Sequence, residues 1–265
     1  MSMSSKDHFL NEKQTKKLDR EIQKTIDRLG LDRKTEDEVF DKSTLLTIEK
    51  LISNKIISYI DFPISTGKEG NIFLGYDHKK TPIAIKIYRI STATFKHITH
   101  YLLGDPRFQT IHKSRRDIVY AWTSKEYKNL KLLQEIQVTA PRPIKKLHNV
   151  LIMQYIGSEY RPAPLLKDVQ LKTPQRTYQQ IMDSIEKMYT HAHLVHSDLS
   201  SFNILMHQNK PYIIDLGQAV LLDHPKAYEF LKRDIHNIVS YFKKYNIRED
   251  ENSIFTRITE ESDIL

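Results

Sequence analysis

The sequence predicts an α+β protein built from two lobes, and three observations support this fold class. Strand-like apolar runs lie at 64–76, 83–88 and 147–156, whereas long amphipathic helical patterns fill 173–192 and 223–242. The length of 265 residues suits one two-lobed unit with a small appendage. The predicted division is a helical extension at 1–60, a first lobe at 61–153, a second lobe at 154–250 and a tail at 251–265.

The charge balance is basic, and cysteine is absent. Lysine and arginine number 41 against 33 aspartate and glutamate residues, a formal charge of +8 that favours polyanionic partners such as RNA, ribosomes or nucleotides. The lack of cysteine excludes disulfides, thiolate metal sites and a cysteine nucleophile. No apolar run has the length of a signal peptide or a membrane span. We therefore expect a cytoplasmic protein that makes no membrane contact.

Two helical patterns precede the first strand-like run. Residues 11–29 place apolar side chains at helical spacing. Residues 43–55 form a second pattern, whose apolar face is predicted to comprise Leu46, Ile48, Leu51 and Ile52. Neither helix carries a recognisable catalytic residue, so the expected role is packing on the first lobe. Nucleic-acid contact through their many lysines is the alternative.

A glycine-containing hairpin is predicted at 64–76. Protein kinases fold a G-x-G-x-x-G hairpin over the phosphates of ATP, because glycine lets backbone N–H groups approach the oxygens closely. Here Ser65 replaces the first glycine, and its hydroxyl adds a donor that could reach phosphate. An ordinary turn is the alternative. The candidate nucleotide contacts are Ser65, Thr66, Gly67, Lys68, Glu69 and Gly70.

A lysine in the next apolar run requires an anionic partner. Lys86 lies between Ile85 and Ile87 in a match to the V-A-I-K motif of kinases, whose lysine binds the α and β phosphates. A buried ammonium needs a counter-charge. In the helix predicted at 116–136, Glu126 is the only charge in an apolar stripe. We therefore predict a Lys86–Glu126 pair, with a carboxylate at the edge of the stripe as the alternative.

The stretch between Tyr88 and this helix is long and polar. It has no clean periodicity after Gly104, which is typical of a functional or mobile loop. We expect a flap near the nucleotide, in which Thr110 and Ser114 are candidate autophosphorylation acceptors.

The apolar run at 147–156 is predicted to be the strand and hinge that join the lobes. In that role Met153 lies behind the adenine, and the backbone of Gln154 and Ile156 bonds to its edge. A methionine in an apolar strand is otherwise ordinary core. Its position between the helix and the catalytic motif favours the hinge.

The motif with the most chemical content begins at His196. Asp198 and Asn203 match the kinase catalytic loop H-R-D-L-x-x-x-N, and a strand-like run then ends in Asp215, as in the metal-binding D-F-G. Phosphoryl transfer needs one carboxylate to hold the attacking oxygen, and an amide with a second carboxylate to hold metal ions. Three such residues at this spacing favour these roles over capping of turns.

The segment after Asp215 is short for the helical lobe of a protein kinase. One helix is predicted there, capped by Asp223 with Pro225 in its first turn. Arg233 and Asp234 within it could brace the catalytic loop. No A-P-E motif follows, and 50 residues remain. We predict a truncated second lobe without activation segment or substrate platform, so peptide substrates would lack their usual docking surface.

Together these motifs resemble the RIO family of atypical protein kinases. The resemblance runs from about residue 50 to about residue 245. It is carried by S-T-G-K-E at 65–69, I-A-I-K ending at Lys86, K-E-Y-K-N-L at 125–130, H-S-D-L-S at 196–200 with Asn203, and I-I-D-L-G-Q at 213–218. Without an obvious winged-helix domain, and with its long segment after Tyr88, the chain is similar to the Rio-one subgroup. The short chain resembles archaeal members.

The resemblance implies a kinase that binds ATP with Mg²⁺ or Mn²⁺, autophosphorylates on serine and serves maturation of the small ribosomal subunit. It also implies an ATPase reaction in which the metal-binding aspartate, here Asp215, accepts phosphate transiently. In this scheme Asp198 is base or orienter, Asn203 and Asp215 hold metal, and Lys86 with Glu126 binds phosphate. RIO proteins usually have serine where Gly217 stands, so the local hydrogen bonding differs here.

Two other functions stay open from the sequence alone. A small-molecule kinase of the aminoglycoside or choline type also has H-x-D-x-x-x-x-N and lacks A-P-E, although the S-T-G-K-E loop argues against it. The other is a basic module that binds ribosomal RNA or the ribosome, with ATP as a switch. Salt-dependent RNA binding that survives loss of Asp198 would favour this module.

Overall fold

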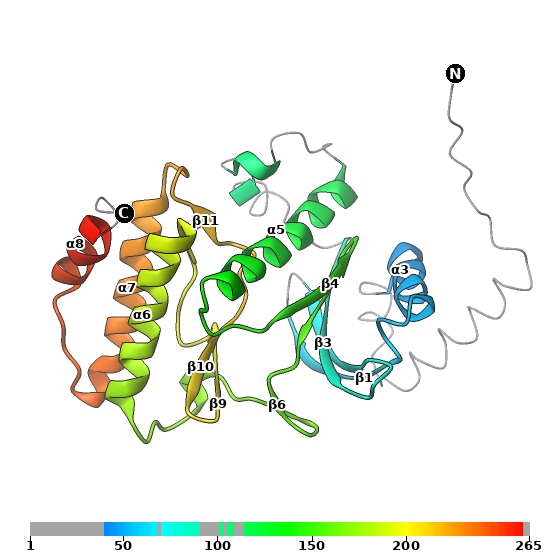
Figure 1. The fold of residues 1–265 in the computed structure, drawn as a ribbon, viewed down its shortest axis with the longest axis horizontal. Coiled ribbons are helices and arrows are strands. Elements are labelled where there is room, and N and C mark those ends of the chain that lie inside the picture. Colours follow the sequence, from blue (N-terminus) through cyan, green and yellow to red (C-terminus); the bar gives the residue numbers. More distant parts are fainter. Residues whose placement is uncertain (1–39, 68–69, 91–100, 103–104, 109–113, 262–265) are drawn as a thin grey trace, which may run out of the picture.

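The chain folds into two adjoining lobes, one rich in strands and the other in helices, which confirms the predicted fold class (Figure 1). The structure is a computed structural model, and it describes residues 40–67, 70–90, 101–102, 105–108 and 114–261. The predicted helix at 11–29 lies outside these residues, as does most of the polar stretch after Tyr88.

The first lobe is built on a five-stranded sheet of order β1-β2-β3-β5-β4, in which every neighbouring pair is antiparallel. The strands are β1 (Tyr59–Thr66), β2 (Gly70–Tyr76), β3 (Pro82–Tyr88), β4 (Pro143–Leu147) and β5 (Val150–Gln154). The strand predicted at 147–156 was too long at both ends, since β5 covers only its middle part. His148 and Asn149 instead form the turn from β4 to β5, and His148 has a φ of 49°.

The side chains of β3 alternate between two cores. Three of them pack in the core beneath α3, namely Ile83, Ile85 and Ile87. Ala84 and Tyr88 belong to the other core, which includes Trp122 of α5. Because successive side chains of a strand point to opposite faces, Lys86 lies on the same side as Ala84 and Tyr88. Strand geometry alone therefore directs the Lys86 ammonium toward α5.

Helix α3 (Lys42–Ser53) covers one face of the sheet, as predicted for this segment. Asp41 caps it, since the carboxylate accepts a hydrogen bond from the Thr44 N–H at 2.8 Å. The predicted apolar face was partly wrong: Leu46 and Ile52 are each 40% exposed. Threonines pack in their place, and Thr44 accepts a hydrogen bond from the Asn149 amide of the β4–β5 turn at 2.8 Å.

Helix α5 (Arg115–Glu135) crosses the other face, and its predicted stripe is buried: Val119, Trp122, Glu126, Leu130 and Leu133. The expectation that Glu126 is the only charge there was wrong. Lys125 is fully buried as well, because α5 also contacts the segment that follows Asp215. Ser114 caps the helix by accepting a hydrogen bond from the Asp117 N–H at 3.2 Å.

The second lobe packs three helices together, α6 (Pro174–Ala192), α7 (Ala227–Phe242) and α8 (Glu251–Glu261) (Figure 1). The amphipathic helices predicted at 173–192 and 223–242 correspond to α6 and α7, and each buries one apolar face. Helix α7 starts after Asp223 and Pro225, so these residues neither cap it nor lie in its first turn. Helix α8 was not predicted. Its buried Ile254 and Ile258 dock on the core of this lobe, and this packing outweighs a polar local sequence.

Short pairs of strands carry the loops of the second lobe. They are β6 (Gly157–Ser158) with β7 (Arg161–Pro162), β8 (Leu194–Val195) with β11 (Val220–Leu221), and β9 (Ile204–His207) with β10 (Lys210–Ile213). Three 3₁₀ helices complete the described elements, at Pro106–Phe108, Leu166–Asp168 and Lys243–Tyr245. Within the described ranges, no helix combines the length and the apolar character needed to cross a membrane.

Candidate active site

A cleft of about 460 Å³ receives side chains from both lobes. The first lobe contributes the glycine hairpin, β3 and β5, and the second contributes the loop before β9 and the loop after β10. Most of the predicted site residues line this cleft: Ser65, Gly67, Gly70, Lys86, Glu126, Met153, Gln154, Ile156, Asn203 and Asp215. Thr66 is not among the lining residues, and Lys68 and Glu69 lie outside the described residues.

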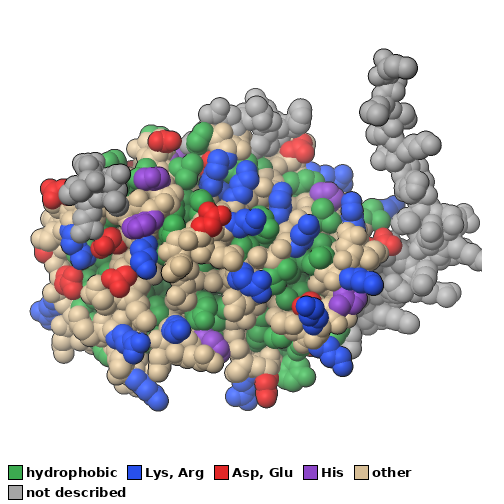
Figure 2. All heavy atoms as spheres, viewed as in Figure 1, with side chains coloured by type: hydrophobic (Ala, Val, Ile, Leu, Met, Phe, Trp, Pro, Cys, Tyr) green, Lys and Arg blue, Asp and Glu red, His purple; other side chains and the backbone are tan. Residues whose placement is uncertain are grey.

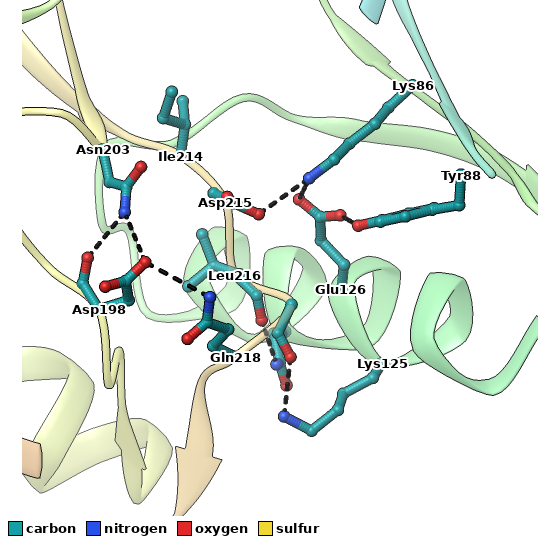
Figure 3. A network of polar contacts seen from close by, with 12 residues as sticks. Lys86, Tyr88, Lys125, Glu126, Asp198, Asn203, Ile214, Asp215, Leu216 and Gln218 are labelled. Carbon is teal, nitrogen blue, oxygen red and sulfur yellow. Dashed lines mark hydrogen bonds and ion pairs between the residues drawn. The ribbon is translucent and has the colours of Figure 1, made fainter. Parts of the chain in front are cut away.

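Lys86 bridges the carboxylates of Glu126 and Asp215, and all three residues line the cleft (Figure 3). Its ammonium lies 2.9 Å from Glu126 Oε1 and 2.9 Å from Asp215 Oδ1. The sequence predicted the first partner and missed the second. The Tyr88 hydroxyl donates to the other oxygen of Glu126, which fits its place two residues after Lys86 on the same face of β3. Glu126 is therefore held by two side chains of one strand.

The charges of this cluster shift one another. Burial disfavours the Lys86 ammonium, but the carboxylates of Asp215 and Glu126 raise the pKa of Lys86 above its ordinary value. The Lys86 ammonium in turn holds the pKa of Asp215 below its ordinary value, against the effect of burial. Lys86 and Asp215 are therefore both charged at neutral pH. Asp215 has a φ of 65°, an unfavourable conformation for a residue other than glycine that is often found at functional sites.

The catalytic loop brings Asn203 onto Asp198. The Asn203 amide donates to the Asp198 carbonyl at 2.7 Å and to its carboxylate at 3.2 Å, and the Gln218 amide reaches the same carboxylate at 3.4 Å. Burial raises the pKa of Asp198, which the neighbouring charge of Asp215 raises further and His196 opposes. A carboxylate with a raised pKa is a better proton acceptor.

Asp234 of α7 accepts hydrogen bonds from the backbone of this loop. It is 1% exposed, and its two oxygens accept from the N–H groups of Ser197 and Leu199, each at 2.8 Å. Arg233 donates to the Ser197 carbonyl, and the Asn237 amide donates to the Leu199 carbonyl at 3.0 Å. The predicted bracing of the catalytic loop by Arg233 and Asp234 thus has a concrete geometry.

Replacing Asp234 by alanine is expected to lower the free energy of unfolding by about 2–4 kcal/mol, because two buried N–H groups lose their acceptor. Chemical denaturation of both proteins would measure the difference. Asp168→Ala is the matched control, since the Asp168 side chain is 51% exposed and paired with surface Lys167. A loss in Asp234→Ala no larger than in this control would contradict the bracing role.

Asp234 also predicts a pH dependence of stability. Burial raises the pKa of its carboxyl to about 7, so the folded protein binds this proton more tightly than the unfolded chain does. The contribution of Asp234 to stability is therefore largest below about pH 4 and is lost as the pH rises to about 7. The free energy of unfolding should fall more between pH 5 and 7.5 in the wild type than in Asp234→Asn. An equal fall in both proteins would contradict the shift.

The structure gives Gly70 a packing role and the Gln154 N–H a partner within the protein. A side chain at Gly70 would lie 2.4 Å from the Ile87 carbonyl oxygen, so close packing of β2 on β3 is enough to require this glycine. At the hinge, the Gln154 N–H donates to the Arg142 carbonyl at 2.8 Å. The Gln154 N–H is therefore already bonded and is not available to an adenine edge.

Of the two candidate autophosphorylation acceptors, the structure describes Ser114 alone. Ser114 acts as a helix cap, as described above. Thr110 lies outside the described residues. Within the described part of the chain, no group of three or more histidine, aspartate or glutamate side chains is arranged to hold a metal ion by itself. A metal here would need the amide oxygen of Asn203 beside the carboxylate of Asp215, together with ligands from a substrate.

Comparisons with known proteins give a match to one family. The family model described as "RIO domain" matches residues 71–254. The chain is 38% identical over 226 residues to "RIO-type serine/threonine-protein kinase Rio1" of Haloferax volcanii, which covers 85% of this chain and 78% of that protein. It is 39% identical over 255 residues to the protein of the same description in Methanocaldococcus jannaschii, with 95% and 87% covered.

A solved structure of similar fold is the Rio2 kinase of Chaetomium thermophilum, described as an ADP/Mg²⁺-phosphoaspartate complex. The TM-score is 0.63 at 21% sequence identity, over 80% of this chain and 65% of that one. At this identity the likeness concerns the fold alone.

Proposed function

Because this chain belongs to the RIO family of serine/threonine protein kinases, we propose that it transfers the γ-phosphate of ATP, with Mg²⁺ or Mn²⁺, to a serine hydroxyl or to water. The observation that carries the proposal is Lys86, whose ammonium lies 2.9 Å from both Glu126 and Asp215 inside a cleft between the lobes. In phosphoryl transfer a lysine binds the phosphates, and a neighbouring carboxylate holds the metal ion that bridges them. Lys86 and Asp215 are arranged for these two tasks.

The cleft fits a nucleotide. Its volume of about 460 Å³ is in the range of small-molecule sites. Apolar side chains of Ala84, Met153 and Leu205 line it, as an adenine ring requires, and Lys86 supplies positive charge for phosphates. Asn203 and Asp215 provide the oxygen ligands that Mg²⁺ prefers. When bound, this metal would neutralise charge on the phosphates.

The chain's own residues then have separate tasks. Lys86 stays protonated, because its two carboxylate partners raise its pKa, and Glu126 with Tyr88 fixes where the ammonium points. Asp198 accepts the proton of the attacking hydroxyl or orients it, and its raised pKa suits that task. Asp234 keeps the loop that carries Asp198 in one conformation.

We also propose Asp215 as a transient phosphate acceptor. In that reaction the γ-phosphoryl group bonds to a carboxylate oxygen of Asp215 as its bond to ADP breaks, and water then releases phosphate and restores the carboxylate. Support comes from the Rio2 kinase of Chaetomium thermophilum, which forms a phosphoaspartate complex with ADP and Mg²⁺. Asp215 has its side chain 39% exposed, so solvent can reach it.

The proposed cellular partner is the small ribosomal subunit and its RNA, with autophosphorylation on serine and a cytoplasmic location. Support comes from the formal charge of +8 and from the distribution of that charge. Figure 2 shows lysine and arginine side chains gathered over α5 and β4, where Lys128, Lys131 and Lys145 are exposed. A surface of this kind attracts phosphate backbones.

The test follows γ-labelled ATP with the purified protein, with and without small ribosomal subunits, and scores label on protein against free phosphate. Asp198→Ala is the control for contaminating activity. Label on serine with little free phosphate supports the protein-kinase reaction, and free phosphate stimulated by subunits supports the ribosome-linked ATPase. If neither label nor phosphate exceeds the Asp198→Ala level, the proposed function is wrong.

A further inference from the structure

We propose that Lys125 and Asn129 of α5 are positioning residues that hold the segment from Asp215 to Ala219 in its metal-binding conformation. This inference rests on the proposed function, because it assumes that Asp215 binds metal. It concerns two residues that touch neither nucleotide nor reacting atoms. They act through the backbone of the segment.

Lys125 reaches two carbonyl groups directly after Asp215. Its ammonium donates to the Gly217 carbonyl at 2.9 Å and also to the Ala219 carbonyl, and it lies 5.5 Å from the centre of the Trp122 ring. Figure 3 shows the side chain extending from α5 to this segment. Within the part of the chain that the structure describes, its hydrogen bonds go to carbonyls rather than to a carboxylate.

Asn129 adds a third carbonyl from the next turn of the same helix. Its amide donates to the Leu216 carbonyl at 2.8 Å, and the side chain is fully buried. Lys125 and Asn129 are four residues apart, so they project from one side of α5. The backbone after Asp215 is thus hydrogen-bonded to α5 through three carbonyl oxygens, those of Leu216, Gly217 and Ala219.

The other end of the segment is fastened to the catalytic loop. The His196 ring lies 3.0 Å from the Ile214 carbonyl, and the Ile214 N–H donates to the Asn203 carbonyl at 3.0 Å. Asp215 lies between these two sets of bonds with a φ of 65°. Such a conformation persists only when the surrounding structure enforces it. Lys125 and Asn129 supply that enforcement on the α5 side.

Packing alone does not explain a lysine at this position. A fully buried lysine amino group costs free energy that carbonyl bonds offset only in part, and an apolar side chain of similar length would avoid this cost. The next residue, Glu126, binds Lys86. One helix therefore sets the distance between the phosphate-binding lysine and the metal-binding aspartate, and this geometry explains a polar group kept at this cost.

The experiment compares Lys125→Met with Lys187→Met, a substitution of an exposed lysine on α6. Calorimetric titration measures ATP affinity in excess chelator and again with saturating Mg²⁺. We expect Lys125→Met to bind metal-free ATP within about twofold of wild type and to lose about 10–100-fold in the affinity for ATP with Mg²⁺, the usual effect of removing an outer-shell partner. Lys187→Met should match wild type in both conditions.

Asn129→Leu provides a second variant, which removes one carbonyl bond and keeps the charge. It should show a smaller loss of the same kind, and it carries the test if Lys125→Met does not fold. Equal losses with and without metal would reduce Lys125 to a structural role and overturn the inference, as would wild-type affinity in both variants. Failure of the proposed function would look different, because the wild type itself would then gain no ATP affinity from Mg²⁺.

Discussion

Replacing Asp198 by alanine is expected to reduce phosphate transfer by about 10²–10⁴-fold, the range for loss of a general base or of the group that orients the nucleophile. The Asp198 carboxylate accepts hydrogen bonds from Asn203 and Gln218, which line the cleft, and its pKa is raised by burial. Nucleotide binding should persist, because Lys86, Glu126 and Asp215 are untouched. Turnover of γ-labelled ATP and calorimetric ATP binding measure the two effects separately.

The control for Asp198→Ala is Asp168→Ala, which removes an exposed carboxylate from the second lobe and should leave turnover unchanged. Thermal unfolding of Asp198→Ala should resemble wild type, because the backbone of the loop remains bonded to Asp234. Undiminished turnover in a folded Asp198→Ala protein would remove Asp198 from the mechanism.

Asp215→Ala should have the second large effect, through metal rather than through proton transfer. We expect ATP affinity in the presence of Mg²⁺ to fall by at least about tenfold, because a direct ligand is lost, and turnover to fall with it. Lys86 keeps its bond to Glu126 at 2.9 Å, so the buried ammonium still has a counter-ion. Metal-free ATP affinity should change little, which titration in excess chelator would measure.

Together the two substitutions separate the roles of the carboxylates. Asp198→Ala should change turnover without changing the effect of Mg²⁺ on binding, whereas Asp215→Ala should change both. If Asp215→Ala bound ATP with Mg²⁺ as tightly as wild type, metal binding would have to be assigned elsewhere. The same result would also remove the basis for positioning by Lys125.

Much of the fold was predictable because local patterns and tertiary packing agree. The alternation along β3 puts Lys86 on the α5 side, and the helical stripe of α5 puts Glu126 on the buried side. Two periodicities, each readable from a few residues, are enough to predict that pair. The spacing of Asp198 and Asn203 likewise reflects a single loop, whose residues meet by local geometry.

Contacts between distant segments were not predictable in the same way. The bond from Lys125 to the Gly217 carbonyl depends on how α5 crosses the loop, and backbone carbonyls leave no signal in the sequence. Helix α8 was likewise not predictable, because its segment has two buried isoleucines and no longer apolar pattern. Leu46 and Ile52 were assigned to a core that Thr44 and Thr47 fill, because hydrophobicity alone does not reveal the partner surface.

The contact between Gly217 and Trp122 is a distant contact that sequences of relatives could reveal. A Cβ atom at Gly217 would lie 3.0 Å from three atoms of the Trp122 indole, and this ring is 1% exposed. The indole N–H has no hydrogen-bond partner among the described residues. Relatives with serine in place of this glycine would need the tryptophan ring to shift by a few tenths of an ångström or to be replaced by a smaller side chain. The residue types at the two positions should therefore be correlated during evolution.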